Sequence, residues 1–504
     1  MPSPTAVPPH QEIELKLALP CADPAALPGL LAKHPALVRR KSERLALHNV
    51  YYDTPDQQLR KAQAVLRIRR AEDPARSQWL QTLKVGGDML AALSRRGEWE
   101  TEVATAALDI QALPADVWSR LDPDGRLFEA LAPCFVTAFE RTRWQVRRRD
   151  GSCVEVALDI GEVRSAGQTA PICELELELL AGPPQALFDL ALSLASTLAL
   201  LPLTTSKSQR GFALAEGSAA APVAARPAVL MPRMALADAA RTVLREMFAQ
   251  FSCNLVLLRD HADPELVHQA RVGWRRFRTA RRLFRKVPGI DTLPGQAPLE
   301  PLLQALGVLR DIEVARDEVL PPWASAYVDG DGLRESAWLH MRACLDERHT
   351  HQRATVSQLL EQPATGAVLL AMTVWLEGVA QDRDGAAVLL APARVIDRAW
   401  AVARLKRMRE RLDSSAAESR SAQDLHHTRI LAKRIRYAVE SLRGLLPRKQ
   451  AARWHRQATR LQKGIGNTRD GAQAVRLLTA LNVHPGLIEF IRGACADGSS
   501  AAPS

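Results

Sequence analysis

Two stretches, Glu12-Ile-Glu-Leu-Lys16 and Cys173-Glu-Leu-Glu-Leu-Glu178, alternate charged with mainly aliphatic residues at every second position. Because successive side chains of a β-strand point to opposite faces, this period of two gathers the charges of each stretch on one face. The aliphatic side chains then form the opposite face. The chain between and around these stretches is therefore predicted to contain amphipathic strands.

Six further segments show the same alternation, and turns that contain Pro, Gly or Asp separate them. Helical insertions are expected after residues 20 and 104. The eight predicted strands cover residues 11–19, 46–53, 64–70, 78–84, 96–103, 137–148, 152–160 and 171–180.

The charges on the polar faces are sorted by sign along several strands. Arg67 and Arg69 share one face, and Glu98 and Glu100 share another. A solvated sheet face remains an alternative, but such a face usually mixes the signs because neighbouring like charges repel. Sorting by strand favours a closed barrel whose charged faces look inward across a water-filled lumen and whose apolar faces lie under helices.

A lumen with about as many bases as acids suits a polyanion that arrives with a divalent metal ion. Arg and Lys side chains hold phosphoryl oxygens, and carboxylates hold Mg²⁺ or Mn²⁺. The sequence has no G-x-x-x-x-G-K-[ST] loop, so we expect side chains rather than a helix N-terminus to bind phosphate.

The ordered set of motifs resembles the CYTH domain, the triphosphate tunnel fold. Besides the two opening stretches, the motifs are Tyr51-Tyr-Asp-Thr-Pro55, Leu66-Arg-Ile-Arg69, Trp79-Leu-Gln-Thr-Leu-Lys84, Arg96-Gly-Glu-Trp-Glu100, Val154-Glu-Val-Ala-Leu-Asp159 and Ser206-Lys-Ser208. The resemblance implies an eight-stranded antiparallel barrel that binds a triphosphate with metal and usually hydrolyses it.

The resemblance also assigns roles to single residues. Glu12, Glu14 and Lys16 would be catalytic. The side chains implied to bind the phosphates are Lys16, Arg67, Arg69, Lys84, Arg141, Arg143 and Lys207. Those implied to hold Mg²⁺ or Mn²⁺ are Glu12, Glu14, Glu98, Glu100, Asp159, Glu174 and Glu176. Arg96 could serve either the substrate or the fold.

The net charge of +11 is concentrated in the second half of the chain. Residues 1–215 hold 25 of the 67 basic and 26 of the 56 acidic residues, which leaves 42 basic and 30 acidic residues beyond them. The change coincides with an Ala- and Pro-rich stretch at 216–232. We therefore expect two domains of different chemistry, at 10–215 and 233–492, joined by this linker and followed by a disordered tail at 493–504.

The second half repeats itself. His268, Arg271, Arg275 and Arg278 have the same spacing as His426, Arg429, Lys433 and Arg436, and Arg282 continues the first set. At about 100° per residue each set forms one stripe on a helix. A solvated basic face is the simpler interpretation, but repelling charges that occur twice in the same pattern favour an anion between them.

These stripes, with the two segments Gly307-Val-Leu-Arg-Asp311 and Gly466-Asn-Thr-Arg-Asp470, resemble the CHAD domain. The resemblance implies two pseudo-symmetric helical bundles whose basic pocket binds inorganic polyphosphate through both stripes. The expected fold class is thus a two-domain α+β chain, with a barrel followed by an all-α domain. Aromatic residues are only 5% of the chain, so nucleic acid is a less favoured partner.

The leading hypothesis is metal-dependent hydrolysis of inorganic triphosphate to diphosphate and phosphate, with polyphosphate bound by the helical domain. The alternatives are a non-catalytic polyphosphate-binding protein and a barrel that acts on thiamine triphosphate or ATP. The sequence shows no signal peptide and no uninterrupted apolar span, and its seven cysteines are scattered. We expect a cytoplasmic protein without membrane contact, with association with polyphosphate granules as an open alternative.

Overall fold

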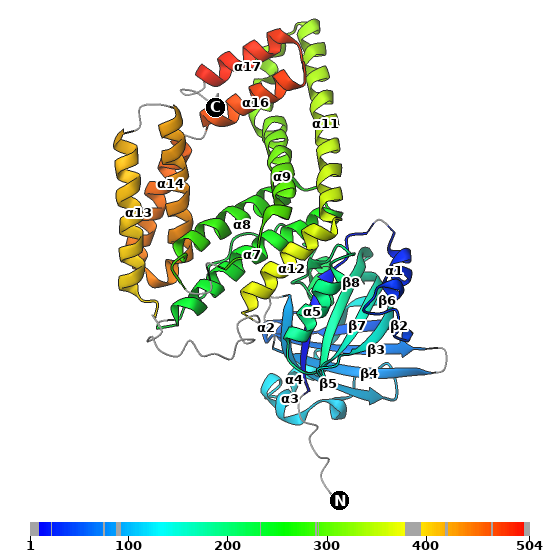
Figure 1. Cartoon of the computed structure of the whole chain (residues 1–504). Helices are drawn as coiled ribbons and strands as arrows, with labels where there is room; N and C mark the ends of the chain where they lie inside the picture. The colour runs from blue at the N-terminus through cyan, green and yellow to red at the C-terminus, as the bar shows by residue number, and fades with distance from the viewer. Residues whose placement is uncertain are drawn as a thin grey trace, which may run out of the picture. The chain divides into compact units, whose positions relative to one another are not determined.

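The computed structural model describes residues 10–21, 23–73, 76–86, 92–231, 233–287, 290, 292–378, 395–418, 422–464 and 467–497. The chain divides into two compact units (Figure 1). The first comprises Met1–Ala221 and Glu361–Gly385, and the second comprises Pro222–Leu360 and Ala386–Ser504. Helix α12 (Pro363–Glu377) therefore packs with the first unit, although its sequence lies between two parts of the second.

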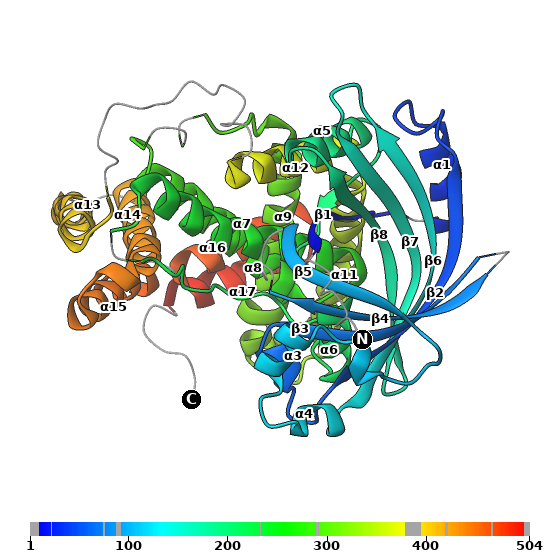
Figure 2. The ribbon, with the colours of Figure 1, turned by 90° about the horizontal axis from the view of Figure 1, so that it is seen from below.

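The first unit contains a closed antiparallel barrel, as predicted. Its strands are β1 (His10–Ala18), β2 (Ser42–Asp53), β3 (Ala64–Glu72), β4 (Ser77–Val85), β5 (Leu93–Val103), β6 (Ala132–Arg147), β7 (Cys153–Ser165) and β8 (Gln168–Ala181). They follow the order β5-β4-β3-β2-β6-β7-β8-β1, and a short β9 (Leu201–Pro202) flanks β1. Pairing of β1 with β5 closes the barrel (Figure 2).

Several strands are longer than the alternation predicts. β2 begins at Ser42 and β6 at Ala132, because their ends pair with each other from Ser42 opposite Trp144 to Asp53 opposite Ala132. Backbone pairing extends a strand past the point where its side chains stop alternating. Charge alternation therefore predicts the centres of these strands better than their ends.

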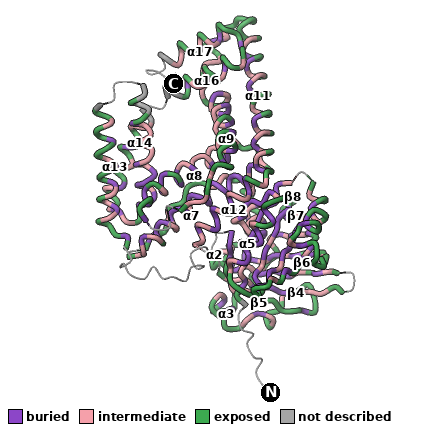
Figure 3. The backbone as a smooth tube through the Cα atoms, in the orientation of Figure 1, coloured by how far each residue is buried: buried purple, intermediate pink, exposed green. Residues whose placement is uncertain are grey.

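The outward-facing side chains of the strands form the main core of the first unit. Figure 3 marks buried residues along β8 and α12. Leu15, Leu17, Leu175 and Leu177 are fully buried there, against α5 (Gln185–Leu194) and α12. Each such side chain contributes about 1.5–3 kcal/mol to stability through burial. The charges opposite these leucines on the same strands are thereby held in the lumen.

Helices connect and cover the strands. The predicted insertions are η1 (Pro24–Ala26) with α1 (Leu27–Lys33), and η2 (Ile110–Ala112) with α3 (Ala115–Leu121) and α4 (Arg126–Glu129). The short α2 (Gln58–Lys61) follows β2, and α6 (Lys207–Ala215) follows β9.

The described part of the second unit is helical, as predicted. Its elements are α7 (Leu236–Asp260), α8 (Pro264–Leu283), η3 (Ala297–Leu299), α9 (Glu300–Glu313), the π-helical η4 (Val314–Val319), η5 (Pro321–Trp323), α10 (Ala324–Val328), α11 (Gly332–Leu360), α13 (Arg398–Glu418), α14 (Ala422–Ser441), η7 (Arg443–Leu445), α15 (Arg448–Gly464), α16 (Asn467–Ala480) and α17 (Pro485–Asp497). The two basic stripes lie on α8 and α14. Helix α17 extends five residues into the segment predicted as a tail.

None of the seven cysteines, all of which lie in the described residues, forms a disulfide bond. Among the described helices, none is by itself long and apolar enough to cross a membrane, although α11 and α12 taken as a bent pair meet that criterion of length and composition.

Candidate active site

The lumen of the barrel holds a cavity of about 1260 Å³. Most of the residues predicted for the site line it, and so does Arg96. The predicted residues that line the cavity are Glu12, Glu14, Lys16, Arg67, Arg69, Lys84, Glu98, Glu100, Arg141, Arg143, Glu176 and Lys207. Two predicted metal ligands, Asp159 and Glu174, are fully buried and are not part of this lining.

Strand register places cations opposite acids in the lumen. Lys16 on β1 lies opposite Glu176 on β8, and Lys84 on β4 lies opposite Glu98 on β5. Arg141 on β6 lies opposite Asp159 on β7. Directly opposed side chains are close enough to interact, so the sheet itself sets these pairs.

Glu12 is the acidic centre of one group. Its two carboxylate oxygens accept bonds from Lys84 Nζ at 2.7 Å and Arg96 Nε at 2.7 Å. Burial by itself would raise the pKa of Glu12, but Lys84 and Arg96 outweigh burial and hold that pKa below its ordinary value. Arg96 also bonds Glu14, which in turn contacts Lys16. Arg96 thus bridges the two carboxylates predicted to be catalytic.

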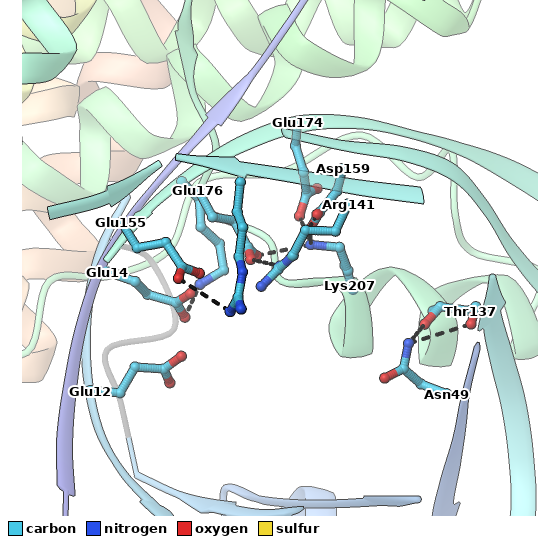
Figure 4. Close-up of polar contacts among 12 residues, drawn as sticks. Glu12, Glu14, Asn49, Thr137, Arg141, Glu155, Asp159, Glu174, Glu176 and Lys207 are labelled. Carbon is cyan, nitrogen blue, oxygen red and sulfur yellow. Dashed lines mark hydrogen bonds and ion pairs between the residues drawn. The ribbon is translucent and has the colours of Figure 1, made fainter. Parts of the chain in front are cut away.

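Lys207 is the centre of a second group (Figure 4). Its Nζ lies 2.6 Å from Asp159 Oδ2 and 2.9 Å from Glu176 Oε1, and it also contacts Glu174. Arg141 binds Asp159 through two bonds of 2.7 Å and reaches Glu176 Oε2 at 2.6 Å. Burial would lower the pKa of Lys207, but the three carboxylates raise it above its ordinary value.

Helix α6 positions Lys207 at its first residue. The Ser206 side chain accepts from Gln209 N, and the Gln209 side chain accepts from Ser206 N, which forms a capping box. At Gly211 a Cβ atom would come within 2.1 Å of the Phe135 ring. The absence of a side chain there lets α6 lie close to β6.

The carboxylates of Asp159, Glu174 and Glu176 have oxygens within 4.8 Å of one another and are the one acidic cluster with metal-ligand spacing in the described residues. Three cations, Lys207, Arg141 and Arg210, already pair with this cluster. Asp159 and Glu174 are therefore best explained as the groups that hold Lys207 and Arg141 in position.

Glu178 and Glu155 line the cavity but are absent from the predicted site. Glu178 lies opposite Glu14 on one side and Glu155 on the other, so three carboxylates meet across β1, β8 and β7. Burial is the main cause that raises the pKa of Glu178 to about 7, and Glu12 and Glu98 add to it. In the described part of the chain Glu178 has no ion pair. Its place in the alternation with Glu174 and Glu176 was the signal that could have identified it.

Arg67 and Arg69 on β3 line the cavity together with Glu98 and Glu100 on β5. Arg67 Nη2 lies 3.8 Å from both glutamates, and Arg69 Nε donates to Asn49 Oδ1 at 2.7 Å. Burial first and Arg67 second lower the pKa of Arg69 to about 10. Two buried guanidinium groups side by side favour an anion in front of them.

Tyr51 is a further lumen residue that the alternation did not resolve, because Tyr51 and Tyr52 fall on opposite faces. Tyr51 is buried, stacks on Phe135 with ring centroids 4.5 Å apart, and hydrogen-bonds Arg67. Burial would raise the pKa of its phenol, but Arg67 and Arg69 lower it below the ordinary value.

Arg143 lies near the rim of the lumen. Its side chain is 40% exposed, and it lies 2.8 Å from Glu43 and 3.5 Å from Glu155. Substrate would have to compete with these carboxylates for Arg143.

In the second unit, the α8 stripe is partly buried at His268, Arg271 and Arg275 and exposed at Arg278 and Arg282. Arg271 crosses α9 at Gly307, where a Cβ atom would come within 2.9 Å of its Nη1. Burial and Arg275 lower the pKa of Arg271. On α14, Arg429, Lys433 and Arg436 are also partly buried, whereas the side chain of His426 lies outside the described residues.

Comparison with protein families agrees with this division of the chain. The model of the CYTH domain matches residues 10–212, and the model of the CHAD domain matches residues 242–479. The chain contains a CYTH domain followed by a CHAD domain. The CYTH match covers the barrel through α6, and the CHAD match begins in α7 and ends in α16.

Among known proteins, the inorganic triphosphatase of Haemophilus influenzae is 35% identical over 206 residues, which is 40% of this chain. The chain spans about half (55%) of the length of that relative. The crystal structure of the CHAD domain from the plant Ricinus communis is 26% identical with a TM-score of 0.46, and it covers 56% of this chain and 93% of that one. A putative adenylyl cyclase from Hippeastrum, described as having a dominant triphosphatase activity, is 20% identical with a TM-score of 0.27, over 41% of this chain and 95% of that one.

Proposed function

We propose that the CYTH domain hydrolyses inorganic triphosphate to diphosphate and phosphate with the help of Mg²⁺ or Mn²⁺. The observation that supports this most directly is the gathering of cations and carboxylates from β1, β3, β4, β5, β6, β8 and α6 around one cavity of about 1260 Å³. The name of the relative from Haemophilus influenzae agrees with the proposal.

The cations would bind the substrate by exchanging partners. Without substrate, Lys84, Arg141 and Lys207 are neutralised by the carboxylates beside them. A triphosphate offers them several charged oxygens, and each charge-assisted hydrogen bond contributes about 1.5–3 kcal/mol. Lys16, Arg67 and Arg69 would complete this phosphate-binding set, with Arg143 at the rim.

We assign the divalent ion to the carboxylates at the meeting of β1, β8 and β7. These would have to draw together to bind it, because metal-ligand spacing among the described residues is found at Asp159, Glu174 and Glu176. Glu12, Glu14, Glu178 and Glu155 supply carboxylate oxygens, which Mg²⁺ and Mn²⁺ prefer. Because the pKa of Glu178 is raised to about 7, a bound cation would readily displace the proton of this carboxyl group near neutral pH. When bound, the metal would supply charge neutralisation at the phosphoryl oxygens. Glu98, Glu100 and Glu176 remain further candidates for this role. Asp159 and Glu174 are fully buried and do not line the cavity, which favours a supporting role for those two.

Side chains of the lumen would hold the triphosphate and the attacking water in position for the reaction. Arg67, Arg69, Lys84 and Lys207 fix the phosphates from several sides, which holds the terminal phosphoryl group in one position and stabilises its charge during transfer. Lys16, Glu12 and Glu14 lie together on β1, where a carboxylate could hold the attacking water and accept its proton.

We assign the CHAD domain the binding of inorganic polyphosphate through the stripes on α8 and α14. The stripe residues His268, Arg271 and Arg275 are partly buried, and Arg275 Nε has no hydrogen-bond partner in the described part of the chain. A buried donor of this kind favours an anionic ligand. Association with polyphosphate granules would follow from this binding.

An organic triphosphate is a second candidate substrate because part of the cavity wall is apolar. Trp99, Ile110 and Trp118 line the same cavity as the charges. They could contact the organic group of ATP or thiamine triphosphate. A panel of tripolyphosphate, ATP and thiamine triphosphate at equal concentration separates the candidates by their kcat/KM values, and a higher value for tripolyphosphate supports the main proposal.

The carboxylates of β1 provide the decisive test of turnover. In the presence of Mg²⁺, the variant Glu12→Ala with Glu14→Ala should release orthophosphate from tripolyphosphate at least about 10²-fold more slowly than the unaltered chain. The matched control, Glu72→Ala with Glu102→Ala, removes two exposed carboxylates from β3 and β5 and should retain the rate. Equal rates in the unaltered chain and the Glu12, Glu14 variant would exclude hydrolysis in the lumen.

A further inference from the structure

The two helical repeats of the CHAD domain differ at one place in the packing of their first helix pair. His268 and His426 set the correspondence, so each residue of α7 and α8 matches the residue 158 positions later in α13 and α14. In the first repeat the backbones pack closely, since a Cβ atom on Gly273 would lie 2.7 Å from Phe251 N. In the second repeat Leu431 occupies the position of Gly273, and a groove of about 760 Å³ separates α13 from α14.

Arginines line this groove where the first repeat has small buried side chains. Arg407 and Arg411 on α13 correspond to Ala249 and Cys253, which are 4% and 8% exposed. The groove is thus built from the sequence of the second repeat alone. Arg407, Arg411 and Arg434 belong to neither basic stripe, and Arg434 borders Arg278 and Arg282 of the α8 stripe.

Arg434 differs from its counterpart in the first repeat in the groups that surround it. Its counterpart Arg276 donates to Gln250 Oε1 at 2.6 Å and lies 3.5 Å from Glu440. Met408 replaces Gln250 and offers no oxygen, and Arg282 replaces Glu440.

Arg434 therefore has a like charge where its counterpart has a carboxylate. Burial first, and then Arg282 and Arg278, lower the pKa of Arg434. Burial and then Arg407, Arg285 and Arg411 likewise lower the pKa of Arg404. Such clusters of like charge are unfavourable unless an anion lies among them.

We propose that the groove between α13 and α14 is a second anion-binding site, specific for a compact ligand that carries phosphoryl groups. Arg407, Arg411 and Arg434 bind its oxygens, with Ser414 and His427 as neutral partners. Glu410 and Asp424 also line the groove and interrupt its positive charge, which favours a short anion over a long polyphosphate chain. Inorganic diphosphate has the required chemistry.

The test is calorimetric titration of inorganic diphosphate into the full chain. Arg67→Gln with Lys84→Gln serves as the common background, because it removes phosphate ligands from the lumen and leaves the helical unit unchanged. Adding Arg411→Gln with Arg434→Gln should weaken the remaining diphosphate binding at least about tenfold, since two charge-assisted contacts are lost. The matched control, Lys449→Gln with Arg453→Gln, removes two exposed charges of α15 and should change binding less than about twofold.

Arg407→Gln with Arg411→Gln provides a second groove variant, because both residues are exposed. Their replacement should therefore leave folding intact. It should also weaken diphosphate binding. Equal weakening by the groove and α15 variants, or no weakening by either groove variant, would overturn the proposal. It would also be overturned if the groove variants affected only long-chain polyphosphate or only RNA.

Discussion

At the scale of single residues, Glu178 is the lumen carboxylate whose charge changes near neutral pH. Its folded-state pKa of about 7 lies above the ordinary value of 4.5, mainly because it is buried. A carboxylate must lose its proton to bind a metal ion. The metal affinity of the lumen should therefore rise with pH up to about 7 and level off above it.

Glu178→Gln should remove this pH dependence and weaken Mn²⁺ binding about 10–100-fold at pH 8. The same substitution should stabilise the metal-free protein at pH 8. Below pH 4.5 both folded and unfolded states keep the proton, so Glu178 has no effect there. As the pH rises toward 7, Glu178 loses its proton in the unfolded state but not in the folded state. This difference lowers the free energy of unfolding by about 1–3 kcal/mol. Metal titrations and urea unfolding at pH 5 and pH 8 measure both effects, and unchanged metal binding by the variant at pH 8 would refute this role for Glu178.

At the scale of secondary structure elements, α6 connects packing to chemistry. Its capping box begins the helix at Lys207, and Gly211 allows it to approach Phe135. The sequence motif Ser206-Lys-Ser208 predicts Lys207 as a phosphate ligand. It does not predict that Asp159 and Glu174 hold Lys207, because that contact depends on where α6 lies across β7 and β8.

Gly211→Val should displace α6 and with it Lys207. We expect a loss of about 2–4 kcal/mol in the free energy of unfolding and at least a tenfold loss of kcat for tripolyphosphate. Gly29→Ala in α1 is the matched control, because no atom lies within 4 Å of the added Cβ and a helical alanine should stabilise by up to about 1 kcal/mol. Urea unfolding and orthophosphate release measure both variants, and a Gly211→Val protein with normal kcat would show that Lys207 does not depend on this contact.

At the scale of the whole molecule, alternation and repetition predicted the barrel, the helical domain and most lumen residues. Strand alternation decides which face a side chain occupies, and Arg67, Glu98 and Lys84 accordingly line the cavity. The sequence could not predict which carboxylates would be neutralised. It also could not place α12, which is apolar around its circumference and so indicates burial without indicating the partner. The partner includes Leu200, since a Cβ atom on Gly366 would lie 2.6 Å from Leu200 N.

We infer that inward-facing cations of the barrel act together on one triphosphate. The most direct measurement is the Kd for tripolyphosphate of Arg67→Gln with Lys84→Gln, compared with that of Arg70→Gln with Arg95→Gln, which removes two exposed charges from strands of the same barrel. Loss of two charge-assisted contacts should raise the Kd of the lumen variant at least about 10²-fold and leave the control within about twofold of the unaltered chain. Similar Kd values for the two variants would contradict the claim.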